Sequence, residues 1–183
     1  FLFVSLFVMS YQLTGGMSAS VADETQPHLV MLIAEDEYRT NESLPVFAAE
    51  HLDRDFRVTT VSGSKTERND IPGIEAIADA DVLLVSVHRR VLPTAQLKFV
   101  RDYVAAGKPV VGIRTASHAF SLRKKQPPAG LVDWPEFDAQ VFGGNYHNHH
   151  GNKLKSTVAI TNAKHKITEG LTPQVSPQGW SLY

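Results

Sequence analysis

The sequence of 183 residues contains no cysteine. This absence excludes disulfide bonds, thiolate metal sites, covalent haem attachment and every mechanism that needs a cysteine nucleophile. The chain also has little net charge, −1 at pH 7, so nothing general attracts it to nucleic acid or to an anionic membrane. With 43% hydrophobic and 20% charged residues, it is typical of one globular domain with a sizeable core.

The charges are unevenly distributed along the chain. Residues 1–88 carry 14 acidic and 5 basic side chains, whereas residues 89–183 carry 5 acidic and 13 basic ones. No run of like charge is long enough to form a charged tail, so we interpret the two halves as complementary parts of one folded unit.

Residues 1–22 begin with an apolar run and end in the small residues Ser20-Val21-Ala22. This pattern is typical of the later part of a secretory signal peptide, where an apolar stretch precedes a small-x-small cleavage site. An N-terminal membrane anchor is the alternative, although the visible run is short for a bilayer span. We therefore expect an exported protein, periplasmic or secreted, whose domain comprises residues 23–183.

Short apolar segments alternate with amphipathic ones in the first two thirds of the chain. We expect strands at 28–34, 56–61, 81–87 and 108–113, and helices at 41–53, 73–80 and 94–106. Asn41 or Ser43 is the expected N-cap of the first helix. Beyond Thr115 the pattern is weaker and indicates a basic loop at 122–131, a helix at 134–142, a strand at 154–160 and an irregular segment at 172–179. Buried strands that alternate with helices predict an α/β fold, a doubly wound and mainly parallel sheet flanked by helices.

Polar side chains follow three of the predicted strands. Open parallel sheets bind ligands at the carboxyl ends of their strands. The residues at these ends are Glu35-Asp36-Glu37-Tyr38 after the first strand, His88-Arg89-Arg90 after the third, and Arg114-Thr115-Ala116-Ser117-His118 after the fourth. The convergence of three polar segments on one edge predicts a functional site there.

A second candidate site is the glycine- and histidine-rich segment 143–151, which reads GGNYHNHHG. His147 and His149 are two residues apart, so they lie on one side of an extended segment, which suits two imidazoles on one divalent metal such as zinc. His150 is a third candidate ligand. Proton transfer or hydrogen bonding to a sugar is an equally open role for these histidines, and His165 could join them from a later turn.

Residues 110–118 have the pattern of a strand that runs into a sharp turn and a helix. Class I glutamine amidotransferases carry their nucleophilic cysteine at such a turn, and Arg114 stands there in this sequence. A guanidinium can bind an oxyanion or polarise a carbonyl, but it is not a nucleophile at ordinary pH. The motif G-x-S-x-G is absent as well, so Ser117 is not predicted to act as a hydrolase nucleophile.

Together these residues resemble the trehalose-utilisation (ThuA-like) family, whose fold is similar to that of the class I glutamine amidotransferases. The resemblance rests on the segments 35–38, 112–118 and 142–150, and on His165 with Gly170-Leu171. It covers most of the chain from His28, and GGNYHNHHG is most similar to exported members from environmental bacteria that degrade complex sugars. Family members usually continue for a few more strands, so the resemblance implies a truncated domain. It also implies a role in trehalose, disaccharide or keto-sugar metabolism.

Two functions remain open at this point. The first is a carbohydrate-active hydrolase, lyase or isomerase without a cysteine nucleophile, acting on a small-molecule carbohydrate. Its candidate catalytic residues are Glu35, Glu37, His88, Arg114 and His118; its candidate substrate-binding residues are Tyr38, Arg89, Ser117, Asn145 and Tyr146; its candidate metal ligands are His147, His149 and His150. The second is a non-catalytic sugar- or metal-binding module of an exported carbohydrate-degrading protein. The oligomeric state, including a homo-oligomer, stays open.

Overall fold

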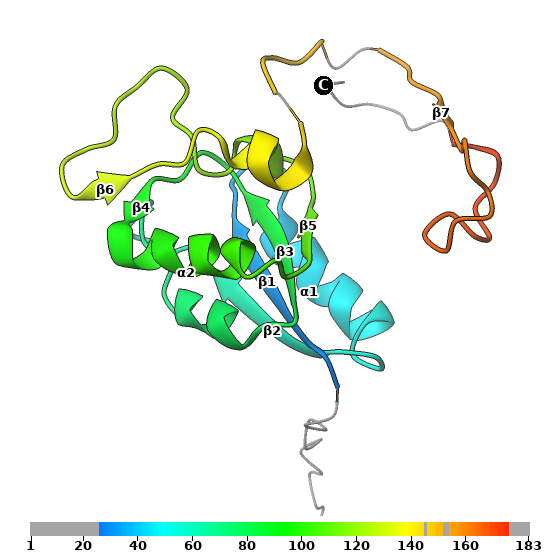
Figure 1. Ribbon diagram of the computed structural model, residues 1–183, viewed down its shortest axis with the longest axis horizontal. Helices are drawn as coiled ribbons and strands as arrows, with labels where there is room; N and C mark the ends of the chain where they lie inside the picture. Colours follow the sequence, from blue (N-terminus) through cyan, green and yellow to red (C-terminus); the bar gives the residue numbers. More distant parts are fainter. Residues whose placement is uncertain (1–25, 145, 152–153, 176–183) are drawn as a thin grey trace, which may run out of the picture.

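A four-stranded parallel sheet forms the centre of the protein in a computed structural model that describes residues 26–144, 146–151 and 154–175 (Figure 1). Its strands are β1 (His28–Ala34), β2 (Arg57–Ser62), β3 (Val82–Val87) and β5 (Val110–Gly112). They are arranged in the order β2-β1-β3-β5, and every neighbouring pair is parallel. The predicted parallel α/β sheet is therefore confirmed, with β1 at its predicted boundaries and the boundaries of the other strands within two residues of the prediction.

Helices cover both faces of this sheet. Helix α1 (Thr40–His51) lies on one face, and helix α2 (Thr94–Ala105) with the 3₁₀ helix η1 (Ile74–Asp79) lies on the other (Figure 1). Because successive side chains of a strand point to opposite faces, β1 contributes to two separate cores. Met31 packs in the core under α1, whereas Leu32 packs in the larger core under α2 and η1. This doubly wound arrangement explains why all seven residues of β1 are buried and apolar or hydrogen-bonded.

Helix α2 shows how the sequence positions one of these layers. Its buried residues Leu97, Val100 and Tyr103 recur at three-residue spacing and so form one apolar stripe against the sheet. The Tyr103 hydroxyl lies 2.9 Å from the carbonyl oxygen of Pro109, at the start of β5. The chain turns after the helix at Gly107, whose φ of 69° is favourable for glycine. Helix and following strand are thus joined by packing and by a hydrogen bond.

The predicted N-cap of α1 was wrong. The helix begins at Thr40, before both Asn41 and Ser43, and no side chain of the flanking residue caps it. The Glu35 carboxylate, at the end of β1, accepts hydrogen bonds from the Thr40 backbone N–H at 2.8 Å and from its hydroxyl at 2.6 Å. A charged acceptor from outside the helix replaces the local cap that the sequence suggested.

The second half of the chain contains shorter elements than the sequence indicated. The predicted helix 134–142 is the five-residue π-helix η3 (Asp138–Phe142). The predicted strand 154–160 shrinks to β7 (Val158–Ala159), which pairs with β8 (Gln174–Val175) inside the segment expected to be irregular. Leu131, assigned to the loop, belongs to β6 (Leu131–Val132), which pairs with β4 (Leu92–Pro93). The exposed β7 side chains lack the apolar cover that would support a longer strand.

Residues 1–22, predicted to be part of a signal peptide or an anchor, lie outside the described residues, so export stays a prediction. Within the described ranges, no helix has the length and apolarity needed to cross a membrane. The segment 154–175 is drawn well away from the central sheet (Figure 1).

Candidate functional site

The predicted site lies where the order of the sheet reverses. The chain passes from β1 outward to β2 and then back across β1 to β3, so the crevice at the carboxyl ends of β1 and β3 is a topological switch point. The short 3₁₀ helix η2 (Ala116–His118) follows β5 and reaches the same edge. Two backbone hydrogen bonds tie η2 to the end of β3, from Arg89 N–H to His118 O at 3.3 Å and from Arg90 N–H to Ala119 O at 2.8 Å. The structure thus brings together the ends of β1 and β3 with η2.

Glu35 organises the turn after β1. Besides the two bonds from Thr40, its carboxylate accepts the backbone N–H groups of Glu37 at 2.6 Å and Tyr38 at 2.8 Å. Burial alone would raise the pKa of Glu35, but these hydrogen bonds outweigh it and hold the pKa below its usual value of 4.5. A carboxylate with this many donors is well suited to fixing the positions of Glu37 and Tyr38.

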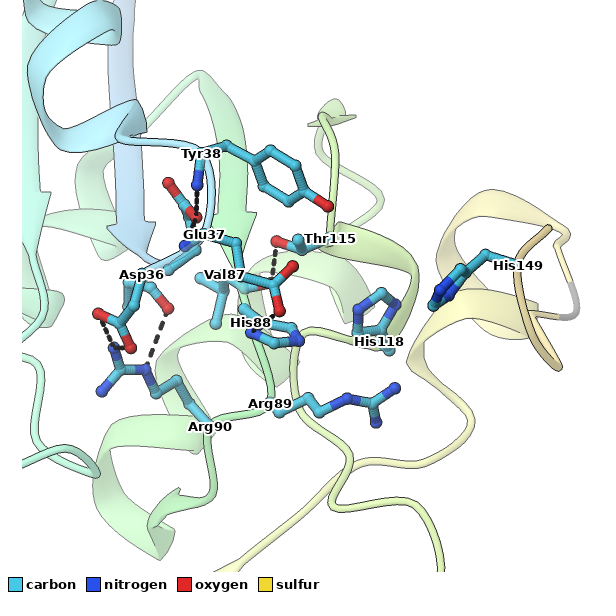
Figure 2. A network of polar contacts seen from close by, with 12 residues as sticks. Asp36, Glu37, Tyr38, Val87, His88, Arg89, Arg90, Thr115, His118 and His149 are labelled. Atoms are coloured by element: carbon cyan, nitrogen blue, oxygen red, sulfur yellow. Dashed lines mark hydrogen bonds and ion pairs between the residues drawn. The ribbon is translucent and has the colours of Figure 1, made fainter. Parts of the chain in front are cut away.

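Asp36 and Arg90 connect β1, β3 and the loop after β2. The buried Arg90 donates to the Ala34 carbonyl oxygen at 3.0 Å, to the Arg68 carbonyl oxygen, and to the Asp36 carboxylate at 3.1 Å. Arg68 also pairs with Asp36 at 2.6 Å. These contacts occupy the Arg90 guanidinium, which therefore holds strand ends together on the side of the site away from His118 (Figure 2).

The imidazoles of His88, His118 and His149 lie beside this turn (Figure 2), and the Tyr146 phenol completes the cluster. The rings of His88 and His118 meet edge to face with centroids 5.1 Å apart, and Tyr146 stacks on His118 at 4.5 Å and 24°. The Tyr146 hydroxyl lies 3.3 Å from Nδ1 of His149. On the other side, Nδ1 of His88 lies 3.7 Å from the Glu37 carboxylate. The strand ends and the glycine-histidine segment therefore meet at His118.

Both central histidines are neutral at neutral pH. Burial lowers the pKa of His118 to about 3, and the positive charge of Arg89 adds to the shift. Burial also lowers the pKa of His88, although the Glu37 carboxylate opposes this. Nδ1 of His118 lies 3.1 Å from the Ser117 hydroxyl. A neutral ring in this place can act as a hydrogen-bond donor or acceptor rather than as a cation.

The sharp turn after β5 differs from the prediction, which placed Arg114 at the turn. Thr115, not Arg114, has the left-handed conformation, with φ of 82°. A β-branched residue is unusual there, and the hydrogen bond from its hydroxyl to the Val87 carbonyl oxygen at 2.8 Å helps to hold it. The guanidinium carbon of Arg114 lies 4.8 Å from the centre of the Tyr38 ring. This turn therefore directs Arg114 toward Tyr38, with which it makes a cation–π contact.

A cavity of about 650 Å³ opens beside His118. The walls come from the end of β3, from η2 and the loop after it, from η3, and from the glycine-histidine segment. The lining residues are Arg89, Ser117, His118, Ser121, Leu122, Arg123, Lys124, Lys125, Pro135, Asp138, Ala139, Gly144, Tyr146, His147 and Asn148. This volume is within the range of small-molecule sites.

The far wall of the cavity is fixed by Asp138 and Phe142. The Asp138 carboxylate accepts the Tyr146 backbone N–H at 2.7 Å. The Phe142 ring packs so closely over Gly112 of β5 that a Cβ there would lie 2.4 Å from it. The close approach to Gly112 lets η3 lie against the sheet, and the hydrogen bond that Tyr146 donates to Asp138 holds Tyr146 over His118.

The structure divides the predicted site residues into groups. Arg89, Ser117, His118, Tyr146 and His147 line the cavity. Glu37 and His88 lie behind His118, and Glu35 lies within the turn. Arg114 and Tyr38 form their own pair and are absent from the cavity lining. Asn145 is outside the described residues.

The metal site at His147, His149 and His150 stays a prediction. Within the part of the chain that the structure describes, no three His, Asp or Glu side chains gather as metal ligands would. His149 contacts the Tyr146 hydroxyl, while His150 is exposed. His165, which could have joined from a later turn, is exposed within 154–175, and its Nδ1 accepts the Ile167 N–H at 3.2 Å.

Sequence reasoning missed the basic wall of the cavity. Arg123, Lys124 and Lys125 had been assigned to a loop without a role, yet all three line the cavity. Asp138 was missed too, because a single acidic residue in a predicted helix gives no signal of its own. The run of three basic residues was the available signal.

Comparisons with known proteins support the fold. No protein-family model matches this sequence, and no curated protein matches it. A crystal structure of a protein from Bacteroides uniformis, provisionally described as ThuA-like, matches with a TM-score of 0.58 and 15% sequence identity. The match covers 91% of this chain, which spans 64% of the length of that one. The fold is therefore ThuA-like, and at this identity the likeness extends no further.

Proposed function

We propose that this protein is an enzyme that moves a proton next to the carbonyl group of a sugar, in the cavity beside His118. The observation that carries the proposal is the juxtaposition of a neutral His118 with Arg89, Tyr146 and His147 around one cavity. Strongly shifted pKa values in a cavity are a recognised mark of functional residues. The resemblance to the ThuA-like family, which implies a role in sugar metabolism, supports a carbohydrate as the substrate, and the structural neighbour supports the ThuA-like fold.

The chemistry follows from the charge state of these groups. When a proton leaves the carbon next to a carbonyl, the electron pair moves onto the carbonyl oxygen. An N–H of the neutral His118 ring and the guanidinium of Arg89 stabilise the negative charge that develops there. His147, on the same cavity, accepts the proton and returns it to the carbon that carried the carbonyl. A proton passes at the same time from the neighbouring hydroxyl oxygen to the former carbonyl oxygen, which completes an isomerisation. If a leaving group is lost instead, the product is that of an elimination.

The remaining residues of the cluster position His118. Glu35 fixes the turn that carries Glu37, and Glu37 lies against Nδ1 of His88. His88 contacts the edge of the His118 ring. Glu35, Glu37 and His88 are therefore positioning residues in this proposal.

The test is exchange of carbon-bound hydrogen in D₂O, followed by proton NMR with a panel of keto-sugars and reducing disaccharides. The wild type should accelerate exchange with at least one sugar, and His118→Gln should lower that rate by about 10²-fold or more. The double variant His147→Gln/His149→Gln should lose the activity as well while keeping its circular dichroism spectrum. The exposed His165 provides a matched control, His165→Gln, which should retain the rate. Unchanged exchange in both cavity variants would overturn the proposal.

A second function, a non-catalytic sugar-binding module, is favoured by the turn after β5, which carries no nucleophile. The Thr115 hydroxyl is bonded to the Val87 carbonyl oxygen, and Arg114 is stacked on Tyr38, so neither acts as a nucleophile. Titration calorimetry with the same sugars separates the two functions. Binding without hydrogen exchange or product would establish the module.

A further inference from the structure

We propose that the substrate of this cavity is an anionic sugar, whose carboxylate or phosphate is bound by Arg89 and by the basic segment Arg123-Lys124-Lys125. This inference rests on the proposed function, since it names the class of sugar that the same cavity takes.

The walls of the cavity are strongly positive for a chain with a net charge of −1. Arg89, Arg123, Lys124 and Lys125 line it, against one acidic residue, Asp138. The Asp138 side chain is buried, and its carboxylate accepts the Tyr146 N–H at 2.7 Å. This carboxylate therefore stabilises the far wall through Tyr146. A ligand in the cavity meets an excess of positive charge.

Arg89 is the deepest of these cations. Its Nη1 donates to the Ser121 carbonyl oxygen at 3.3 Å, which ties the basic segment to the end of β3. Its Nη2 is buried and meets the geometric criteria for a hydrogen bond with none of the residues that the structure describes, although the Tyr146 side chain lies close enough to raise the pKa of Arg89. A buried guanidinium N–H is costly to leave without an acceptor. An anionic oxygen of the substrate would supply one.

Electrostatics point the same way. Burial lowers the pKa of Arg89, and the positive charge of Arg123 lowers it further. Both effects disfavour the positive charge on Arg89. A bound carboxylate or phosphate would relieve them, because it replaces repulsion by charge-assisted hydrogen bonds.

The backbone supports a built site. Arg89 and Arg123 have φ of 50° and 63°, in the left-handed region that few non-glycine residues adopt. The Arg123 N–H donates to the Ser121 hydroxyl at 3.3 Å, which helps to hold this turn. Strained residues of this kind cluster at ligand-binding sites, and here both carry the charge that the proposal uses.

Titration calorimetry tests the inference with three sugars of similar size, D-glucuronate, D-glucose 6-phosphate and neutral D-glucose. At least one of the anionic sugars should bind at least about tenfold more tightly than glucose, and added salt should reduce the difference. Lys124→Gln/Lys125→Gln should weaken binding of the anionic sugar by about threefold to tenfold without changing the affinity for glucose. Lys164→Gln/Lys166→Gln removes two lysines outside the cavity and should change neither. Arg89→Lys should weaken the anionic sugar further, because lysine lacks the planar guanidinium.

The outcomes separate the two proposals. A preference for glucuronate identifies the anion as a carboxylate, and a preference for glucose 6-phosphate identifies it as a phosphate. Equal binding of all three sugars, with no effect of the Lys124 and Lys125 changes, would overturn the anionic substrate and leave the sugar site intact. A protein that binds none of these sugars and exchanges hydrogen in none of the keto-sugar panel would overturn the proposed function itself.

Discussion

Acidification from pH 7 to pH 5 should destabilise this protein through His118. Burial and the charge of Arg89 lower the pKa of this histidine from 6.5 to about 3 in the folded state. Between pH 6.5 and pH 3 the unfolded chain binds a proton at this histidine that the folded protein does not bind, so the free energy of unfolding falls as the pH falls. The loss begins near pH 6.5 and is complete near pH 3.

The size of this effect follows from the shift. Each unit of pH below 6.5 costs up to roughly 1.4 kcal/mol of unfolding free energy, which gives about 2 kcal/mol at pH 5. The His118 residue is only 8% exposed, but it forms the wall of a cavity that solvent enters. Screening there reduces the expected loss to about 1–2 kcal/mol.

Urea unfolding at pH 7 and pH 5 measures this loss, with His118→Gln as the variant that cannot titrate. The wild type should lose about 1–2 kcal/mol more than the variant between the two pH values, whatever the variant's stability at pH 7. His165→Gln, which removes an exposed histidine, should keep the pH dependence of the wild type. Equal pH dependence in the wild type and His118→Gln, or an NMR titration of His118 near pH 6.5, would refute the reasoning.

Three further predictions concern the framework of the site. Glu35→Gln should destabilise the protein by about 1–3 kcal/mol at pH 7. Because the pKa of Glu35 is lowered in the folded state, the ionised carboxylate stabilises the protein above about pH 4.5, and this contribution is lost as the pH falls. The free energy of unfolding, measured as a function of pH, should therefore fall less on acidification in the variant than in the wild type. Gly112→Ala should cost about 1–3 kcal/mol in thermal unfolding, since the new methyl group meets the Phe142 ring; an unchanged melting temperature would show that the ring moves freely. Thr115→Val should cost about 1–2 kcal/mol by losing the bond to the Val87 carbonyl oxygen, whereas Thr115→Ser should recover most of it; equal denaturation midpoints for the two would contradict the role of that bond.

Local sequence patterns were sufficient to predict the sheet. β1 and β3 are short, buried and almost wholly apolar, which is the pattern of strands covered on both faces. The polar residues after them were correctly expected to meet at one edge. This works because the carboxyl ends of parallel strands share an edge, so position along each strand already determines position in the fold.

The partners of individual side chains could not be predicted in this way. Glu35 was a candidate catalytic residue, yet its carboxylate is surrounded by donors from the turn that follows it. Arg114 was another, but the left-handed conformation of Thr115 turns it toward Tyr38. Each of these outcomes depends on contacts that only the folded backbone creates.

The basic wall of the cavity escaped prediction for a related reason. Lys124 and Lys125 lie in an irregular loop, where exposed basic residues are ordinarily only solvated. Their place beside His118 depends on the bond from Arg89 to the Ser121 carbonyl oxygen, 32 residues away in sequence. No periodicity in the sequence reports such a long-range contact.

Hydrogen exchange of a keto-sugar in D₂O, followed by proton NMR with the wild type and His118→Gln, tests the central claim most directly. The wild type should accelerate exchange of the hydrogen next to the carbonyl, and His118→Gln should slow it by about 10²-fold or more without unfolding. Exchange at the same rate in both proteins would contradict the claim that the neutral His118 at the switch point of this sheet performs the chemistry.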